Sequence, residues 1–369
     1  MRADIFRGYD KPLLFIILLL SFFGAVAVYN ASTVSAYRDF GNQYHFIKDQ
    51  LEYFGVGLIF MFGFSLIDYR KWYKLSIPLL VVTLILLMAV FLPGIGIHAY
   101  GAKRWLNLGL FTLQPTEMAK LALVIYLSAW FTHKEKGRFV PFLILLAVMV
   151  GLIILQPDLG TAVIISVIAG VLYFLSGAPF WHFLLLVPVV VAVVLVLALL
   201  APYRLARITT FLNPQIDPQG TSYHIRQILI ALGSGGMFGV GFGKSRQKYA
   251  YLPEANTDSI FAIIAEEVGF IGTAFLVLGF MYLILRAFQL ARRAPDKFGQ
   301  LLGSGIAAWL AFQVLINLAS MVALIPLTGV PLPFISYGGS SLVSLFMGLG
   351  ILLNIGKHGQ KGQPSSGVY

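Results

Sequence analysis

One carboxylic acid stands at the edge of a long apolar run, where it could carry out proton-transfer chemistry. Asp258 directly precedes that run, and Glu266 and Glu267 lie two turns inside it. An aspartate in this place could accept hydrogen bonds from the free amides at a helix N-terminus. It could equally act as a general base that removes a proton from a reacting hydroxyl. Because Asn256 or Thr257 would cap a helix as well, capping alone does not require an aspartate.

The two glutamates cannot join Asp258 in an acid pair on a straight helix. Glu266 would lie about 12 Å further along the helix axis, and Glu267 would face the opposite side of the helix. A glycosidase-type pair of carboxylates is therefore not supported. Ionisable residues in apolar segments usually face a partner or water, so we expect both glutamates to meet other helices or to line water.

A second group of ionisable residues lies in the segment "LQPTEMAK", where Pro115 suits the first turn of a helix. Lys120 follows Glu117 by three residues, which is close enough for an ion pair on one helix face. Such a pair is either a structural ion pair or part of a functional site. Just before it, Arg104 and Trp105 offer a cation and an aromatic ring.

The composition defines the class of protein. Of its 369 residues, 59% are hydrophobic and only 11% are charged, whereas soluble domains carry about 25% charged residues. Many apolar runs reach the length of about 20 residues that crosses a bilayer, so the chain is predicted to be a polytopic membrane protein. We assign the net charge of +11 to loops that face anionic lipid and expect no nucleic-acid partner. The chain has no cysteine, which excludes disulfides and thiolate metal sites.

Ten transmembrane helices are predicted, in an all-α fold that forms a single domain over residues 1–369. The first apolar run is too long for the hydrophobic region of a signal peptide, so we expect it to remain as a helix. One large extracellular loop, 202–257, separates the seventh span from the eighth. The expected spans are 12–31, 51–67, 75–92, 115–131, 139–156, 159–175, 180–201, 259–288, 300–325 and 337–356.

The distribution of positive charge predicts the orientation. An even number of spans puts both termini on one side. With the long loop set aside, that side carries 15 Lys and Arg residues and the other side carries 4. The positive-inside rule then places both termini in the cytoplasm and Asp258 at the outer face.

The long outer loop is basic and rich in glycine. Its six Lys and Arg residues, which include Arg207, Arg246 and Lys248, form either a solvated face or a site for an anionic ligand such as a phosphate group. Apolar residues at helical spacing over 223–232 predict a short helix on the membrane surface. The glycines do not form a Walker loop, because Phe238 stands where that motif requires glycine. We expect a flexible or close-packed turn there.

Four motifs in order resemble the SEDS family (shape, elongation, division and sporulation), which includes RodA and FtsW. They are "GAKRWLNLGLFTLQPTEMAKLAL" at 101–123, "LQPDLGTA" at 155–162, "LGSGGMFGVGFGKSRQKYAYLPEANTDSIFAIIAEEVGFIG" at 232–272 and "TGVPLPFISYGGSS" at 328–341. The resemblance runs nearly from end to end. It implies a peptidoglycan glycosyltransferase that polymerises lipid II, the undecaprenyl-pyrophosphate-linked disaccharide-pentapeptide, into β-1,4 glycan strands.

The resemblance also implies roles for individual residues. The family's essential aspartate falls on Asp258, the glutamate and lysine of its fourth span on Glu117 and Lys120, and its arginine–tryptophan pair on Arg104 and Trp105. Asp258 would then be the general base for the acceptor hydroxyl. Cations would stabilise the departing pyrophosphate. The candidates for that second role are Arg104, Lys120, Arg207, Arg246 and Lys248.

The same resemblance suggests partners and leaves alternatives. A class B penicillin-binding protein and membrane lipids are the expected partners, and a divalent cation, Mg²⁺ or Mn²⁺, is suggested, although no ligand set for a metal is readable. The chain has Asn256-Thr257-Asp258-Ser259 where many relatives have His-Thr-Asp-Phe. The motif "KSRQKYAYLPE" favours the FtsW and sporulation type, whereas the short N-terminal tail is more like RodA. A lipid II flippase and a non-catalytic scaffold for a transpeptidase are the rival functions.

The charge distribution generates a test of topology. A reporter fused after His358 should read as cytoplasmic, and a tag inserted near Gln219 should be labelled by a membrane-impermeant reagent on intact cells. The opposite labelling pattern would place Asp258 on the cytoplasmic side and contradict the predicted orientation.

Overall fold

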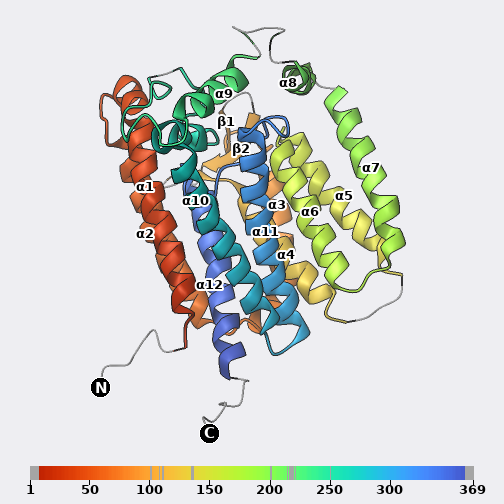
Figure 1. Cartoon of the computed structure of the whole chain (residues 1–369). Helices are drawn as coiled ribbons and strands as arrows, with labels where there is room; N and C mark the ends of the chain where they lie inside the picture. Colours follow the sequence, from red (N-terminus) through yellow and green to blue (C-terminus); the bar gives the residue numbers. More distant parts are fainter. Residues whose placement is uncertain are drawn as a thin grey trace, which may run out of the picture.

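The computed structural model is a bundle of helices with a small sheet at one end (Figure 1). It describes residues 8–99, 102–107, 109, 112–133, 137–199, 202–213, 215, 220, 222–249 and 251–361. The helices are α1 (Lys11–Phe40), α2 (His45–Leu66), α3 (Lys71–Ala89), α4 (Pro115–Trp130), α5 (Phe139–Leu155), α6 (Leu159–Leu175), α7 (Phe180–Leu199), α8 (Pro202–Leu212), α9 (Tyr223–Gly235), α10 (Ile260–Arg292), α11 (Lys297–Met321) and α12 (Gly339–Lys361). The strands are β1 (Gly96–Ala99), β2 (Ala102–Asn107) and β3 (Thr112–Leu113).

The helical, membrane-spanning character predicted from the apolar runs is confirmed. Each predicted span overlaps one helix among the described residues. Five helices, α1, α3, α10, α11 and α12, are long and apolar enough to cross a membrane. The number of ten crossings stays a prediction, because helices such as α5 and α6, at 17 residues each, are shorter than the usual span.

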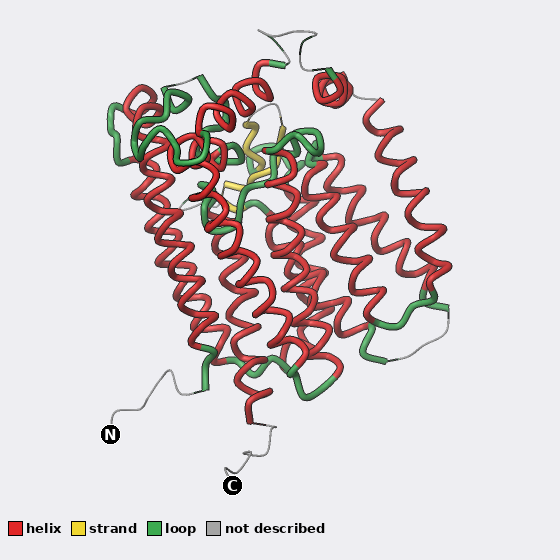
Figure 2. Tube along the Cα trace, viewed as in Figure 1, coloured by secondary structure: helices red, strands yellow, loops and turns green. Residues whose placement is uncertain are grey.

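The two ends of the bundle differ. α1 begins and α12 ends at the same end of the bundle (Figure 1). The opposite end carries α8, α9, the three strands and most of the segment before α10 (Figure 2); we call it the loop end. Asp258 and the first turn of α4 both lie there, so the two groups of ionisable residues seen in the sequence share one end of the molecule.

The loop end contains a small sheet, which the all-α prediction did not include, and two short helices. The strands form an antiparallel sheet in the order β1-β2-β3, so the fold is mostly but not wholly helical. In β2 the side chains of Ala102 and Leu106 are buried while Lys103 and Asn107 are exposed, a pattern too short to read in the sequence. The predicted short helix over 223–232 is confirmed as α9, and its place on the membrane surface stays a prediction. The helix α8 was not predicted.

α10 is interrupted at Gly269, and the glycine-rich loop completes the broken helix. Gly269 has φ 68° and ψ −170°, which is not helical. Residues 240 and 241 donate their amides to the carbonyls of Glu266 and Glu267 at 3.0 and 3.1 Å. The amides of residues 270 and 271 donate to the carbonyls of residues 236 and 237 at 2.9 and 3.1 Å. The loop therefore satisfies backbone groups that a helix break would leave unpaired.

The close-packed alternative for the glycine-rich loop is thus the correct one. Gly239 has φ 79°, a conformation that strongly favours glycine. A side chain on Gly239 would also overlap the carbonyl oxygen of Glu267. Tight backbone contact, not flexibility, explains the glycine here.

This packing generates a prediction. Gly239→Ala should lower the melting temperature of the purified protein by several degrees, because it adds a clash and a strained dihedral angle. Gly233→Ala is the matched control: Gly233 lies within α9 with open space around it, and alanine there favours the helix. Equal melting temperatures for the two variants would contradict the packing argument.

Candidate functional site

Asp258 lies in the turn before α10, and its backbone is fixed from α11. The Asn317 side-chain amide donates to the backbone carbonyl of Asp258 at 2.9 Å and to that of Val330 at 2.8 Å. Asn317 is fully buried, and Asp258 is 8% exposed. A methyl group built on Gly329 would lie 4.0 Å from Oδ2 of Asp258. Asp258 thus lies between α10, α11 and the loop around residue 329, with its carboxylate beside Gly329.

The structure contradicts the capping interpretation of Asp258. The N-cap residue of α10 is Ser259, whose side chain makes no capping hydrogen bond. Asp258 is therefore buried at the start of α10 without being its N-cap residue. A role in chemistry is left as the stronger explanation.

The surroundings of Asp258 raise the pKa of its carboxyl to near physiological pH. Burial is the largest cause that raises the pKa of Asp258, the negative charge of Glu254 also raises it, the positive charge of Arg207 lowers it, and the net value is about 7. A hydrogen bond from Ser259 also lowers this pKa. A carboxyl with such a pKa can both take and release a proton at physiological pH.

One neighbour of this turn comes from α9. The Nε2 atom of His224 lies 2.8 Å from Oγ of Ser259, and Oγ of Ser259 donates to Oδ1 of Asp258 at 3.5 Å. Burial, and secondarily Arg207, lower the pKa of His224 to about 4, so its imidazole is neutral at pH 7.

The predicted Glu117–Lys120 ion pair is confirmed. Nζ of Lys120 lies 2.8 Å from Oε1 of Glu117, and the two side chains are 1% and 3% exposed. Nζ also donates to Oε1 of Gln313 at 3.0 Å and lies 5.2 Å from the ring centre of Trp309. Ser344 donates to the other glutamate oxygen at 3.4 Å. In this conformation both charges are therefore satisfied by the protein.

A single face of α11 connects the ion pair to Asp258. Gln313 and Asn317 are four residues apart and so lie one above the other on that helix. Gln313 bonds Lys120 and donates to the carbonyl of Pro331 at 3.2 Å. These two amides were missed in the sequence, although two polar residues four apart within an apolar run were a usable signal.

The remaining predicted site residues lie in different surroundings. Arg104 donates to the backbone carbonyls of Gln156, at 3.1 Å, and Pro157, while the neighbouring Trp105 is half-buried. Arg207 is exposed and donates to the carbonyl of Leu327 at 3.1 Å, in the loop that contacts Asp258. It is thus the predicted cation that the structure brings to Asp258.

Two further predicted cations differ sharply in exposure. Arg246 is exposed. Lys248 is 8% exposed, and its ammonium group donates to Oδ1 of Asn30 at 2.9 Å, to Oε1 of Glu267 at 3.4 Å and to the carbonyl of Gly243. The contacts of Lys248 hold the loop against α1 and α10.

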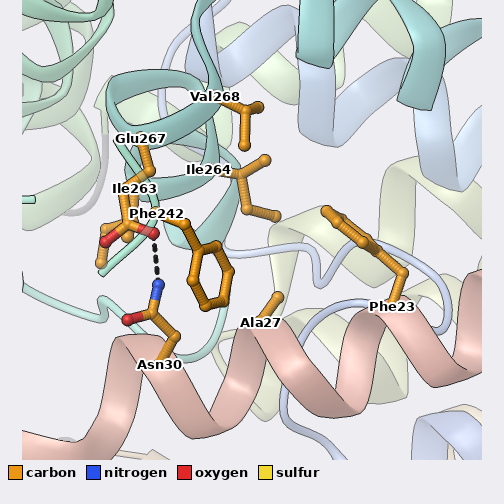
Figure 3. Close-up of a pocket in the computed structure, with 8 residues that line it drawn as sticks. All are labelled: Phe23, Ala27, Asn30, Phe242, Ile263, Ile264, Glu267 and Val268. Atoms are coloured by element: carbon orange, nitrogen blue, oxygen red, sulfur yellow. Dashed lines mark hydrogen bonds between the residues drawn. The ribbon is translucent and has the colours of Figure 1, made fainter. Parts of the chain in front are cut away.

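Glu266 and Glu267 meet partners from the loop and from other helices, as expected. Glu266 accepts from the hydroxyl of Ser245 and from the amides of residues 246 and 247 at 3.3 and 3.4 Å. Glu267 accepts from Asn30 on α1, beside a recess that Phe242 and Ile264 also line (Figure 3). Both acids therefore serve to fasten the loop.

The buried ion pair generates a prediction. Lys120→Met should destabilise the protein by about 3–5 kcal/mol, because it leaves the charge of Glu117 buried without compensation. The double variant with Glu117→Gln should recover part of that loss. Lys74→Met, which removes an exposed lysine from α3, should leave the melting temperature unchanged. A single Lys120→Met variant as stable as this control would rule out the pairing as a source of stability.

Comparison with known proteins agrees with this architecture. The family model described as cell cycle protein, FtsW/RodA/SpoVE, matches residues 11–361. Stage V sporulation protein E of Bacillus subtilis is 42% identical over 95% of this chain and 97% of its own length. A probable peptidoglycan glycosyltransferase FtsW of Trichlorobacter lovleyi is 41% identical over 94% of this chain and 93% of its own.

Two solved structures share the fold. One chain comes from a peptidoglycan synthase complex that coordinates polymerization and crosslinking; it has a TM-score of 0.77 and 31% identity over 94% of this chain and 97% of that chain. The rod shape determining protein RodA of Thermus thermophilus has a TM-score of 0.71 and 30% identity over 96% of this chain and 98% of its own. Taken with the family match across nearly the whole sequence, these likenesses show that the chain belongs to the FtsW/RodA/SpoVE family of cell cycle proteins.

Proposed function

We propose that this chain polymerises lipid II into β-1,4 glycan strands at the outer face of the bacterial cytoplasmic membrane. Relatives at about 40% identity over nearly the full length carry the name peptidoglycan glycosyltransferase, and the chain is an enzyme of this kind. The observation that carries the mechanism is the burial of Asp258 beside α10, where it is not the N-cap residue; the pKa of its carboxyl is raised to about 7.

In the proposed reaction, Asp258 takes the proton of the 4-hydroxyl of the acceptor's N-acetylglucosamine. The oxygen attacks C1 of the donor's N-acetylmuramic acid, and undecaprenyl pyrophosphate leaves with inversion at C1. General-base assistance requires hydrogen-bond reach between the hydroxyl and the carboxylate. Because Asp258 is 8% exposed, the groups around it must move aside for the acceptor to reach it.

The exposed cations are the best candidates for the pyrophosphate. Arg207 lies by Asp258, and Arg246 is exposed on the same loop. The ammonium groups of Lys120 and Lys248 are engaged in buried ion pairs, so we propose that they act by holding the site in shape. Arg104 already donates from Nε and Nη2 to backbone carbonyls, so we propose that it contributes less to pyrophosphate binding than the exposed cations.

A divalent cation, Mg²⁺ or Mn²⁺, would draw most of its ligands from the substrate. The described residues hold no cluster of three or more His, Asp or Glu side chains that could bind a metal. Mg²⁺ at phosphate sites usually keeps waters and binds through substrate oxygens and one or two carboxylates. Its chemistry, when bound, would be neutralisation of the pyrophosphate charge.

Partners and location follow from the family. We propose a class B penicillin-binding protein as partner, since a chain of similar fold belongs to a complex that coordinates polymerization and crosslinking. Placement in the cytoplasmic membrane with both termini in the cytoplasm is supported by the common end of α1 and α12 (Figure 1) and by the basic loops. Relatives named FtsW and stage V sporulation protein E support the division or sporulation type over the RodA type.

The central prediction concerns Asp258→Asn in the purified protein. The variant should fold and bind lipid II but lose about 10²–10⁴-fold in glycan synthesis, the usual worth of general-base assistance. Labelled lipid II and a gel assay of the polymer measure this. If the folded Asp258→Asn variant makes polymer at a rate close to that of the wild type, Asp258 is not the general base. Translocation of lipid II in vesicles without any polymer from the wild type would instead indicate a flippase.

The pH dependence adds a signed test. The base form of Asp258 is needed, so wild-type polymerisation should rise as the pH increases through about 7. Glu254→Gln removes a negative charge that raises this pKa and should move the rise to lower pH. Arg207→Gln removes a positive charge that lowers the same pKa and should move the rise to higher pH. Shifts in the same direction would contradict the assignment.

A further inference from the structure

His224 and Ser259 form a chain of polar contacts that ends on the proposed base. His224 belongs to α9, 35 residues before Ser259, and the two residues meet only because α9 packs on α10. Ser259 is fully buried, so its hydroxyl needs protein partners. The described contacts supply two: Nε2 of His224 at 2.8 Å and Oδ1 of Asp258 at 3.5 Å.

The direction of these hydrogen bonds depends on the tautomer of His224. A neutral imidazole carries one N–H. With the proton on Nε2, His224 donates to Ser259, and the hydroxyl proton is left for Asp258. With the proton on Nδ1, Nε2 accepts the hydroxyl proton, and Asp258 receives nothing from Ser259. A carboxylate beside the hydroxyl favours the first arrangement, because it stabilises a donor that points toward it.

We propose that His224 is a positioning residue that acts through Ser259: as the Nε2–H tautomer it holds the Ser259 hydroxyl as a donor to Oδ1 of Asp258. This leaves Oδ2, which faces Gly329, as the oxygen that takes the acceptor's proton. The inference rests on the proposed function, since it assigns the two oxygens of the proposed base to different tasks.

The proton balance of the step is simple. The acceptor hydroxyl gives its proton to Oδ2 while its oxygen bonds to C1, and the C1–oxygen bond to the pyrophosphate breaks with the electron pair on the leaving group. Ser259 and His224 keep their protons throughout. The distance of 3.5 Å from Ser259 to Asp258 is long for a hydrogen bond, and such contacts in a free enzyme often tighten in the substrate complex.

The charged groups that act on this carboxyl are few. Glu254 comes from the same turn and Arg207 from α8. The described residues that contact Asp258 from α11 and from the loop around residue 329 are neutral: Asn317 bonds its backbone carbonyl, and Gly329 lies beside Oδ2. A change in the titration of Asp258 after substitution of Ser259 can therefore be assigned to the lost hydrogen bond.

The test compares Ser259→Ala, His224→Ala, the double variant and His224→Gln in the full-length protein. Polymerisation of labelled lipid II is followed against pH. Thermal stability against pH, measured with and without Asp258→Asn in each background, reports the titration of Asp258 without activity. Thr209→Ala is the matched control, because its exposed hydroxyl donates to the carbonyl of Ala206 on α8.

Ser259→Ala should move the titration of Asp258 and the rise of activity upward by about one pH unit, because a donor to the carboxylate is lost. At pH 7 its rate should fall about fivefold, because the share of Asp258 in the base form falls from about one half to about one tenth. His224→Ala should act in the same direction, and the double variant should be no worse than Ser259→Ala. His224→Gln, whose amide can also donate to Ser259, should restore much of the activity.

Other outcomes would overturn the inference. If Ser259→Ala leaves the titration of Asp258 unchanged, or if the losses of polymerisation rate add in the double variant, the contact between His224 and Ser259 only joins α9 to α10. Should His224→Ala fail to fold, Ser259→Ala and His224→Gln decide alone. A wild type that makes no polymer would contradict the proposed function. The dependence of thermal stability on pH would still test whether Ser259 and His224 act on the titration of Asp258.

Discussion

Two buried amides on one face of α11 hold the loop end of this protein together. Asn317 joins the backbone of Asp258 to Val330, and Gln313 joins Lys120 to Pro331. Unpaired polar groups are costly in an apolar interior, so each amide strongly favours the arrangement that supplies its partners. The loop that follows α11 is thereby held at two adjacent residues, and the turn that bears Asp258 is held against it. The ion pair of α4 and the acid before α10 belong to one continuous network.

The need to pair buried polar groups also explains the contacts of the charged residues outside this network. Glu266, Glu267 and Lys248 are almost fully buried, yet the loop amides and Asn30 satisfy them. Their contacts fasten a long connection to two helices that lie far apart in the sequence. In the glycine-rich part of this loop, Phe238 and Phe242 are largely exposed. Polar anchors thus take the place that hydrophobic packing has elsewhere in the bundle.

Much of the fold and part of the site could be predicted from local patterns. Long apolar runs predict helices, and a spacing of three residues predicts the Glu117–Lys120 pair, because both depend on neighbours within one element. The partners of Lys248 could not be predicted, since an exposed lysine and a buried one look alike in a sequence. The meeting of His224 with Ser259 depends on how α9 packs. The break at Gly269 was missed because a glycine inside an apolar run also fits an unbroken helix.

The break at Gly269 has a mechanical consequence. A continuous helix would act as a stiff rod between its membrane portion and Asp258, whereas this one is divided. A displacement of the membrane portion of α10 reaches Asp258 through the non-helical backbone of Gly269, through the backbone hydrogen bonds that the loop makes across the break and through contacts with neighbouring helices. The segment that carries Asp258 therefore moves with the loop. A protein that binds the loop would displace Asp258 more than one that contacts α10 within the bilayer.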